Sequence, residues 1–301
     1  MKIIVLKFGG TSVGTLDRIK KVSKIIISYI KKKYKVIVVT SAMSGVTNEL
    51  IKKAGKISKN FPNSERDVLL STGEQMASAL IAGKLCDLGF NSRSWMSWQI
   101  PIITRGNYSS ARIIKIGTDQ LKRYLKKGGT PIITGFQGLN KESRLTTLER
   151  GGSDASAIML AKFFKAKRCI IYTDVDGVYT TDPNLTKKAK KIKALSYEEM
   201  LEMSSLGAKV MQPASIQDAK LNKVKIDVKS SFTNKTGTQI IGRKKIKDTN
   251  IIRGVSFTKN DAKVSLLGVK DKPGVAAAIF EPLYKNSINV DMVVQNISSD
   301  G

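Results

Sequence analysis

Short apolar runs alternate with helical patterns along most of this chain, and that alternation restricts the folds open to it. Ile3–Leu6, Val36–Val39, Pro131–Thr134 and Cys169–Tyr172 are nearly continuous apolar runs. Runs of this kind are typical of strands that are buried on both faces. A glycine or a polar cluster ends each run, and helical periodicity follows in most cases. The pattern therefore predicts an α/β fold with a mainly parallel sheet and helices on both of its faces.

The helices are expected where apolar residues recur three or four positions apart. The first has an apolar face made by Ile19, Val22, Ile25, Ile26, Tyr29 and Ile30. Thr15 or Asp17 is the expected N-cap of that helix. Further helices are expected over residues 64–87, Ser153–Phe164, 196–203 and 207–221. The first of these is expected to be interrupted at Thr72-Gly73-Glu74. A further strand is expected over Val224–Val228.

The character of the chain changes near residue 250. A strand over Val264–Gly268, a helix over Val275–Tyr284 and a strand over Ile288–Ile297 are expected there. About 40 residues with so few elements do not close a core of their own. We therefore expect this segment to be a fragment of a domain, or to pack on the main domain or on a partner chain.

Composition excludes several classes of chemistry. The chain has no histidine, which excludes Ser-His-Asp and Cys-His catalysis and His-ligated metal sites. Two cysteines do not make a disulfide framework, no apolar run approaches the ~20 residues of a membrane span, and no secretory signal is visible. We expect a cytoplasmic protein without a membrane partner and without a protein-bound metal.

The formal charge of +28 allows two interpretations. A nucleic-acid partner is one, and the lysine-rich composition that an AT-rich genome produces is the other. The lysines are dispersed, and aromatic residues do not alternate with them as a base-stacking surface requires. We therefore expect no specific nucleic-acid partner, although the charge should attract anions such as ATP.

The segment Lys7-Phe8-Gly9-Gly10 joins the first strand to the first helix. An ordinary tight turn is one interpretation. In the other, backbone N–H groups, a helix N-terminus and the Lys7 ammonium together bind a phosphate. Parallel strands end at one edge of a sheet, where ligands bind. Thr40-Ser41-Ala42-Met43 and Thr173-Asp174 also follow strands, so these segments should meet there.

Three other motifs have a structural and a functional interpretation. Arg150-Gly151-Gly152-Ser153-Asp154 is either a glycine turn with Ser153 as the N-cap, or a site in which the Arg150 guanidinium binds a carboxylate. Tyr172–Tyr179 is either an Asp/Gly turn or a contact for adenine and ribose. Glu74 is either a solvated helix residue or the partner of a substrate ammonium.

In combination, these motifs closely resemble the aspartokinase family. Lys-Phe-Gly-Gly-Thr-Ser at residues 7–12 matches its signature, and residues 40–47, 71–75, 135–138, 150–154 and 173–179 follow in the family's order and spacing. The resemblance implies the amino-acid-kinase fold, a three-layer α/β/α sandwich around a mainly parallel sheet. It places the catalytic domain at 1–250 and a partial α+β ACT regulatory region at 262–301.

The same resemblance implies ATP-dependent phosphorylation of the L-aspartate side chain to 4-phospho-L-aspartate. That reaction opens lysine, threonine, methionine and diaminopimelate biosynthesis. Such a protein would use ATP with nucleotide-bound Mg²⁺ and L-aspartate as substrates. It would respond to lysine or threonine as effectors, and it would form a homo-oligomer. An acceptor carboxylate with a pKa near ~4 is already ionised at pH 7, so the missing histidine is no obstacle.

The roles of single residues follow from the resemblance alone. Lys7 and Asp154 are the implied catalytic residues. The residues implied to bind aspartate are Ser41, Thr47, Glu74, Arg150, Gly151, Gly152 and Ser153. Those implied to bind the nucleotide are Lys7, Phe8, Gly9, Gly10, Thr173, Asp174, Tyr179, Asn184 and Lys209. Those implied to bind an effector are Asp271, Gly274, Ala276, Asn289 and Gln295. Asn184 departs from the family, which commonly has Arg after Asp-Pro, and Lys187 or Lys188 is expected to compensate.

Three alternatives remain open at this point. A kinase of the same fold could act on glutamate or on a nucleoside monophosphate. A basic nucleic-acid-binding protein would account for the charge, and an inactive paralogue would keep the fold without the reaction. Thr72-Gly73-Glu74 and residues 150–154 favour aspartate, and the presence of Lys7, Glu74 and Asp154 argues against inactivity.

Overall fold

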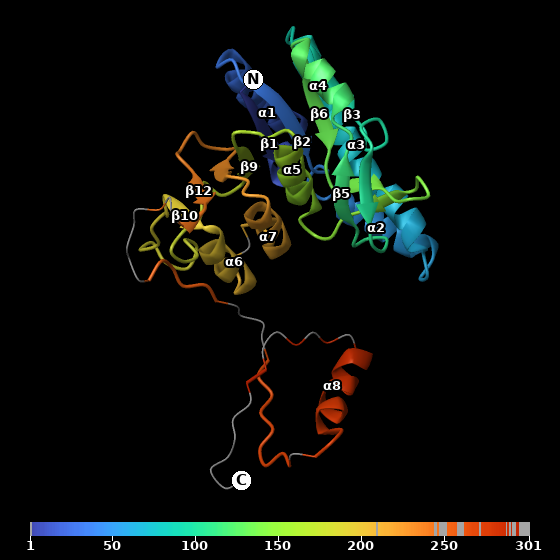
Figure 1. Ribbon diagram of the computed structural model, residues 1–301, viewed down its shortest axis with the longest axis vertical. Coiled ribbons are helices and arrows are strands. Elements are labelled where there is room, and N and C mark those ends of the chain that lie inside the picture. The colour runs from blue at the N-terminus through green and yellow to red at the C-terminus, as the bar shows by residue number, and fades with distance from the viewer. Residues whose placement is uncertain are drawn as a thin grey trace. The chain divides into compact units, whose positions relative to one another are not determined.

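The computed structural model describes residues 2–208, 210–243, 246, 252–257, 262–270, 272–286, 288, 290, 293 and 294. The chain divides into two units, Met1–Phe257 and Thr258–Gly301, which we describe separately (Figure 1).

An eight-stranded sheet is the centre of the first unit. Its strands are β1 (Ile3–Phe8), β2 (Lys35–Thr40), β3 (Ser92–Trp95), β6 (Thr130–Thr134), β9 (Cys169–Thr173), β10 (Ala194–Ser196), β11 (Ile226–Ser230) and β12 (Thr238–Ile241). Their order is β10-β12-β11-β9-β1-β2-β6-β3. The pairing of β11 with β12 is antiparallel and every other pairing is parallel. The predicted mainly parallel sheet is confirmed.

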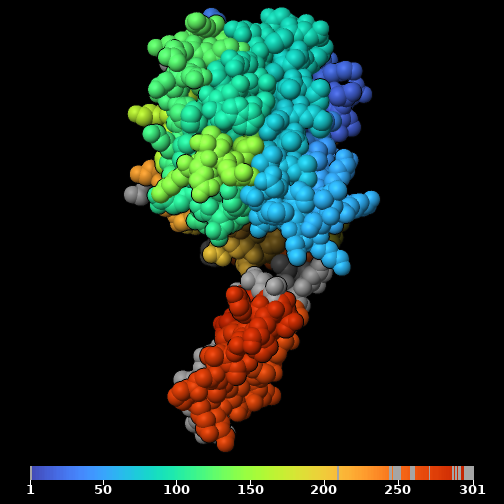
Figure 2. All heavy atoms as spheres, turned by 90° about the vertical axis from the view of Figure 1, so that its right-hand side faces the viewer, coloured from blue at the N-terminus to red at the C-terminus, as the bar shows by residue number. Residues whose placement is uncertain are grey.

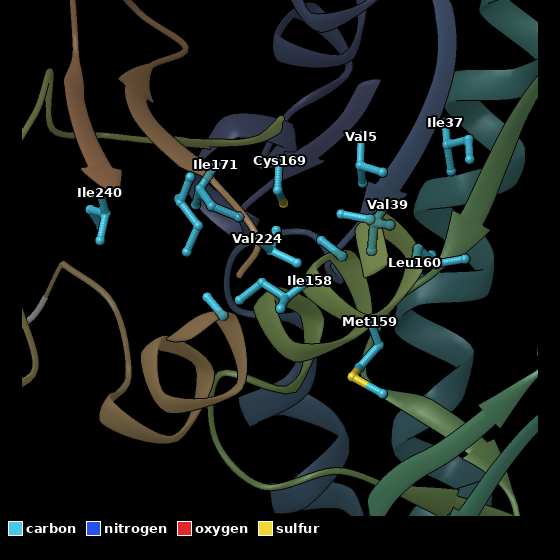
Figure 3. Close-up of a cluster of buried hydrophobic side chains, with 14 of the residues drawn as sticks. Val5, Ile37, Val39, Ile158, Met159, Leu160, Cys169, Ile171, Val224 and Ile240 are labelled. Carbon is cyan, nitrogen blue, oxygen red and sulfur yellow. The ribbon is translucent and has the colours of Figure 1, made fainter. Parts of the chain in front are cut away.

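Helices cover both faces of this sheet. On one face, α1 (Leu16–Lys31) and α3 (Asn63–Asp87) contribute Ile26 and Ile81 to a core with Leu6 of β1. On the other face lie α4 (Asp119–Lys126), α5 (Gly152–Phe163), α6 (Tyr197–Ser205) and α7 (Pro213–Leu221). Figure 3 shows this second core, in which Val5 and Val39 of the sheet lie above Ile158 and Leu160 of α5. The three-layer α/β/α architecture is therefore confirmed.

A second, four-stranded sheet was not expected from the sequence. It consists of β4 (Ile102–Arg105), β5 (Arg112–Ile116), β7 (Gln137–Leu139) and β8 (Leu145–Thr147), in the order β5-β4-β7-β8. Helix α2 (Val46–Ile57) packs on α3, which also contacts β8. This small sheet matters for function because β7 and β8 lie in the chain between β6 and α5, the two elements that carry predicted site motifs.

Several element boundaries differ from the prediction. Thr15 is confirmed as the N-cap of α1, where its side chain accepts a hydrogen bond from the Arg18 N–H. The predicted interruption at Thr72-Gly73-Glu74 is wrong, because α3 runs through it without a break. The helix expected over 207–221 begins only at Pro213, whose fixed φ suits the first helical position. The strand expected from Val224 begins at Ile226.

The second unit has one helix among its described residues, α8 (Val275–Lys285), as predicted. Gly274 is its N-cap with a φ of +91°. Val264–Gly268 is not a strand, because no described segment pairs with it. Most of Ile288–Ile297 lies outside the described residues. Within the described ranges, we find no helix with the length and apolar character needed to cross a bilayer.

Candidate active site

Lys7 and Asp154 form an ion pair at the carboxyl edge of the sheet. Lys7 is the penultimate residue of β1, and its Nζ lies 2.7 Å from Oδ1 of Asp154 in the first turn of α5. Only 11% and 9% of the two side chains are exposed. A Cβ placed on Gly9 would lie 3.5 Å from Lys7 Nζ, so the glycine backbone passes beside the ammonium group. A cation and the glycine loop are therefore adjacent, as an anion site requires.

The loops after β1 and β2 pack closely, and small residues make this possible. A Cβ on Gly10 would lie 3.0 Å from the Ala42 carbonyl oxygen. A Cβ on Gly73 would lie 2.8 Å from Ala42 Cβ, which is closer than side chains pack. Gly73 therefore lets α3 approach the Ala42 loop without interrupting the helix, and this approach brings Glu74 of α3 to the same edge.

Glu74 is a buried carboxylate with one unpartnered oxygen. Its Oε1 accepts a hydrogen bond from the Ala42 N–H at 3.1 Å, and its Oε2 has no partner among the described residues. Burial raises the pKa of Glu74 to about 7, against the opposing effects of the Ala42 N–H and the Lys7 charge. Such a group is poised to accept a cationic ligand such as an ammonium.

The N-terminus of α5 lies at this edge, with a cap that differs from the prediction. Gly151, with a φ of +83°, is the N-cap, and Ser153 lies inside the first turn. The prediction that Ser153 caps the helix is therefore wrong. Glycine is required at position 151, because φ is positive there and a Cβ would lie 2.4 Å from Gln212 Cγ.

Ser153 is nevertheless part of the site. A Cβ on Gly135, which follows β6, would lie 2.8 Å from Ser153 Oγ and 3.0 Å from the Thr40 carbonyl oxygen. Gly152 also needs to be small, because a Cβ there would lie 2.6 Å from Leu148 Cβ. Arg150 precedes this turn and is exposed. The ends of β1, β2 and β6 thus converge on α5.

Ser41, Thr47 and Phe8 have clear positions. The Ser41 N–H donates to the Phe8 carbonyl oxygen at 3.1 Å, and Thr47 lies in the first turn of α2; both residues are half-buried. The Phe8 ring is fully buried and stacks on Tyr172 with 4.9 Å between the ring centroids. The Phe8 side chain is therefore not available to a nucleotide.

The predicted nucleotide residues Thr173 and Asp174 follow β9, the neighbour of β1. Thr173 Oγ1 donates to Asp174 Oδ1 at 3.0 Å. The Gly9 N–H donates to the Tyr172 carbonyl oxygen at 3.0 Å, which ties this strand end to the glycine loop. Thr173 and Asp174 therefore lie next to the loop that contains Gly9 and Gly10.

Tyr179 belongs to a polar cluster that the sequence did not reveal. Its hydroxyl donates to Asp176 Oδ1 at 2.7 Å, and Lys191 and Lys235 lie 3.4 and 3.7 Å from Asp176 Oδ2. Burial alone would raise the pKa of Asp176, but the Tyr179 hydroxyl and the two ammonium groups outweigh it and lower that pKa. Two cations are thus held near the predicted nucleotide residues.

The remaining predicted residues are less informative. Asn184 is exposed, and its N–H donates to Asp182 Oδ1 at 2.8 Å in a local turn. Lys187 and Lys188 are exposed as well. Of the effector residues, Gly274 and Ala276 lie at the start of α8. Lys209, Asp271, Asn289 and Gln295 lie outside the described residues.

Arg18 was missed by the sequence analysis. Its Nη2 donates to the carbonyl oxygen and to Oγ of Ser231 at 2.7 and 2.8 Å, and its guanidinium lies 3.7 Å from the Phe232 ring centroid. Ser231 in turn donates its Oγ–H to Ser12 Oγ and its N–H to the Thr173 carbonyl oxygen. Arg18 therefore joins the glycine loop to the ends of β9 and β11. The polar residues Ser230 and Ser231, the last residue of β11 and the one after it, were the available signal.

A positive charge, a glycine loop and a helix N-terminus at one sheet edge can bind and polarise a phosphoryl group. The partly unsatisfied Glu74 next to them can bind a cation. In the described part of the chain, no group of three or more His, Cys, Asp or Glu side chains could hold a metal ion. The site is therefore equipped for a ligand that carries both phosphate and ammonium, or for two ligands that meet there.

These features define a phosphotransferase of the amino acid kinase family, and the chain belongs to that family, whose model matches residues 2–230. An ACT domain model matches residues 264–299. Within the family, the relatives of this chain are aspartokinases. The Geobacillus stearothermophilus aspartokinase is 42% identical over 299 residues, which cover 99% of this chain and 74% of that protein. The resemblance stated from the motifs is confirmed.

Solved structures agree with this assignment. E. coli aspartokinase III in complex with aspartate and ADP, an R-state structure, is 26% identical with a TM-score of 0.75, covering 98% of this chain and 77% of that one. The same enzyme with lysine and aspartate, a T-state structure, is 25% identical with a TM-score of 0.79 and the same coverage.

Proposed function

We propose that this protein transfers the γ-phosphoryl group of ATP to the side-chain carboxylate of L-aspartate and so forms 4-phospho-L-aspartate and ADP. The observation that carries the proposal is the buried Lys7–Asp154 pair beside Gly9 at the sheet edge. It occurs in a chain that is 42% identical to an aspartokinase over nearly its full length.

The reaction needs positioning and charge neutralisation more than proton transfer. An aspartate side-chain oxygen forms a new bond to the γ-phosphorus, and the bond from that phosphorus to the β–γ bridging oxygen breaks as ADP leaves. The acceptor is already ionised at pH 7, so no general base is required. Lys7 and the Gly10 N–H would offset charge on the transferred group, and Asp154 would orient Lys7. One such contact is worth roughly 3 kcal/mol of the barrier. The Gly9 N–H, which the sequence also pointed to, already donates to the Tyr172 carbonyl oxygen and so holds the loop in place.

The aspartate backbone groups have separate partners in this proposal. Glu74 would bind the α-ammonium through its unpartnered oxygen. Arg150 would bind the α-carboxylate, since its guanidinium suits a carboxylate in two-point contact. Ser153 at the start of α5 would support the same carboxylate, with Ser41 and Thr47 completing the pocket and Gly151 and Gly152 giving the backbone room.

The nucleotide would lie along the ends of β1 and β9. Thr173, Asp174, Tyr179 and Lys209 would contact it together with the glycine loop. Lys191 and Lys235 could supply the positive charge that Asn184 lacks. The carboxylates of Asp154 and Asp174 are hard oxygen donors of the kind that Mg²⁺ prefers. These two carboxylates would hold a Mg²⁺ ion that is bound to the ATP phosphates, and the ion would offset phosphate charge.

We also propose that residues 1–250 form the catalytic domain and residues 262–301 an ACT regulatory region of a homo-oligomer. The ACT model match and the lysine complex of E. coli aspartokinase III support lysine as an effector, and threonine is the alternative. Gly274 has the left-handed conformation that starts α8, where backbone N–H groups could receive an effector carboxylate. Activity and light scattering with and without each amino acid would test this.

A coupled assay of ADP release tests the main proposal. The substrates to compare are aspartate, glutamate, N-acetylglutamate and UMP, with hydroxylamine trapping of the acyl phosphate as a second readout. Aspartate should have the highest kcat/KM by at least tenfold. Faster turnover of glutamate or of UMP than of aspartate would reject the assignment.

A further inference from the structure

Three residues on the buried face of α3 form hydrogen bonds with other segments of the chain. Asp67, Ser71 and Glu74 are spaced four and three residues apart and so share one face of the helix. Glu74 accepts from Ala42. The Ser71 carbonyl oxygen accepts from Gln137 Nε2 at 3.1 Å. Asp67 is the third of these residues, and it has no role in the phosphoryl transfer proposed above.

Asp67 is fully buried and its carboxylate is completely hydrogen-bonded. Oδ1 accepts from the hydroxyls of Ser109 and Thr147 at 2.9 and 2.7 Å. Oδ2 accepts from the backbone N–H groups of the same two residues, also at 2.9 and 2.7 Å. Burial of an ionised carboxylate is costly unless it is paired in this way. Four hydrogen bonds therefore hold Ser109 and Thr147 against one buried carboxylate of α3.

The two partners of Asp67 lead to different places. Ser109 lies in the turn between β4 and β5. Thr147 is the last residue of β8, three residues before Arg150. Leu148 donates its N–H to the Phe136 carbonyl oxygen, and the Gly152 N–H donates to the Glu149 carbonyl oxygen. These two bonds tie the backbone shortly before Arg150 and across it. Figure 2 shows the yellow-green surface of the β7–β8 region beside the blue surface of α2 and the start of α3.

Helix α3 therefore connects the two halves of the amino-acid pocket. Asp67 and Glu74 are two helical turns apart, about 10 Å along a rigid axis. Glu74 is the proposed ammonium partner, and Thr147 places the segment that carries Arg150, the proposed carboxylate partner. A shift of β8 relative to α3 would change the spacing between these two groups.

We propose that Asp67 is a positioning residue that fixes Arg150 relative to Glu74 and thereby sets the affinity of the site for an α-amino acid. The inference rests on the proposed function, because it uses the assigned roles of Arg150 and Glu74. Loss of the Asp67 contacts should weaken aspartate binding and leave ATP binding nearly unchanged.

Two variants with matched chemistry separate this role from a general effect on folding. Thr147→Val and Ser109→Ala each remove one hydroxyl donor to Oδ1 of Asp67, but only Thr147 lies on the path to Arg150. We expect Thr147→Val to raise the dissociation constant of aspartate at least fivefold, with the KM for ATP within twofold. Ser109→Ala should change both by less than twofold.

Substitution of Asp67 itself gives the larger effect. Asp67→Ala should raise the aspartate dissociation constant at least tenfold, measured by calorimetry on the full chain. Asp67→Asn should restore it to within threefold, because an amide oxygen still accepts from the two N–H groups and the amide N–H₂ can donate to the two hydroxyls. If Asp67→Ala does not fold, the Thr147 and Ser109 pair decides the question.

The outcomes separate the inference from the function beneath it. Equal effects of Thr147→Val and Ser109→Ala on aspartate binding, or parallel losses of aspartate and ATP affinity, would overturn the positioning role of Asp67. A parent protein that shows no aspartate binding and no aspartate-dependent ADP release would remove the proposed function as well. A parent that binds aspartate, with a Thr147→Val variant that binds equally well, would remove only the inference.

Discussion

The buried carboxylate of Glu74 should make both stability and substrate affinity depend on pH. Only 3% of the residue is exposed, and burial raises its pKa from 4.5 to about 7. A group whose pKa is higher in the folded state binds its proton more tightly there. Its contribution to stability is therefore complete below pH 4.5 and is lost as the pH rises through 7. The shift corresponds to about 3 kcal/mol of free energy of unfolding.

Urea denaturation of the parent and of Glu74→Gln between pH 4.5 and 9 measures this effect. The amide cannot ionise, so the free energy of unfolding of the parent should fall by about 3 kcal/mol relative to the variant across that range. The two proteins share all other titrating groups, and the difference isolates Glu74. A difference that stays constant within about 0.5 kcal/mol would refute the argument that burial controls this carboxylate.

Aspartate binding should change in the opposite sense. The substrate ammonium needs the ionised form of Glu74, so affinity should rise with pH and level off above about pH 7. Below pH 7, the dissociation constant should increase about tenfold per unit, since one proton must leave. Calorimetry at pH 6 in two buffers of different ionisation enthalpy should detect nearly one proton released per aspartate. Glu74→Gln should bind aspartate weakly at every pH and release none.

Three further predictions concern the other parts of the site. Lys7→Met should lower kcat by about 10²–10³, the effect of losing one charge-stabilising contact, and should destabilise the fold because Asp154 is left buried and unpaired. The double variant Lys7→Met/Asp154→Asn should recover the urea midpoint but not the rate. A double variant that regains activity would contradict the role of Lys7. Gly135→Ala would place a Cβ 2.8 Å from Ser153 Oγ, so the KM for aspartate should rise at least fivefold in steady-state assays, whereas Gly55→Ala, where nothing lies within 4 Å of the added Cβ, should match the parent. Tyr179→Phe removes the hydrogen bond from the Tyr179 hydroxyl to Asp176 and should raise the KM for ATP about threefold with no change in the KM for aspartate. Equal changes in both constants would refute a role of Tyr179 in nucleotide binding.

The parallel layer could be predicted from the sequence because its signals are local. Strands β1, β2, β6 and β9 are buried on both sides and read as continuous apolar runs. The carboxyl-edge rule then placed Lys7, Ala42 and Thr173 together without any knowledge of contacts. The small sheet has no continuous apolar runs of this kind. Strand β5 is largely exposed, and the four strands of the small sheet have only three to five residues each.

The cap of α5 and the course of α3 could not be predicted, because both depend on contacts between distant segments. Ser153 has the right residue type for an N-cap, but the helix starts at Gly151, where φ is positive and the side chain of Gln212 leaves no room for a Cβ. Gly73 suggested a helix break, but its role is to let α3 approach Ala42. In both cases the glycine also permits a close approach between distant segments, which residue types along the chain do not reveal.

The charged residues of the site show the same distinction at the level of chemistry. The sequence indicates Glu74 as an ammonium partner, but it does not show whether the carboxylate is solvated or buried, and burial raises its pKa to about 7. Asp67 lies only two turns earlier on the same helix, yet four donors from Ser109 and Thr147 satisfy it completely. One acid on this helix face keeps an open oxygen that can receive a ligand, and the other has none to offer. Binding capacity on α3 is therefore determined by which carboxylate the fold leaves incompletely hydrogen-bonded, and this cannot be read from the residue types alone.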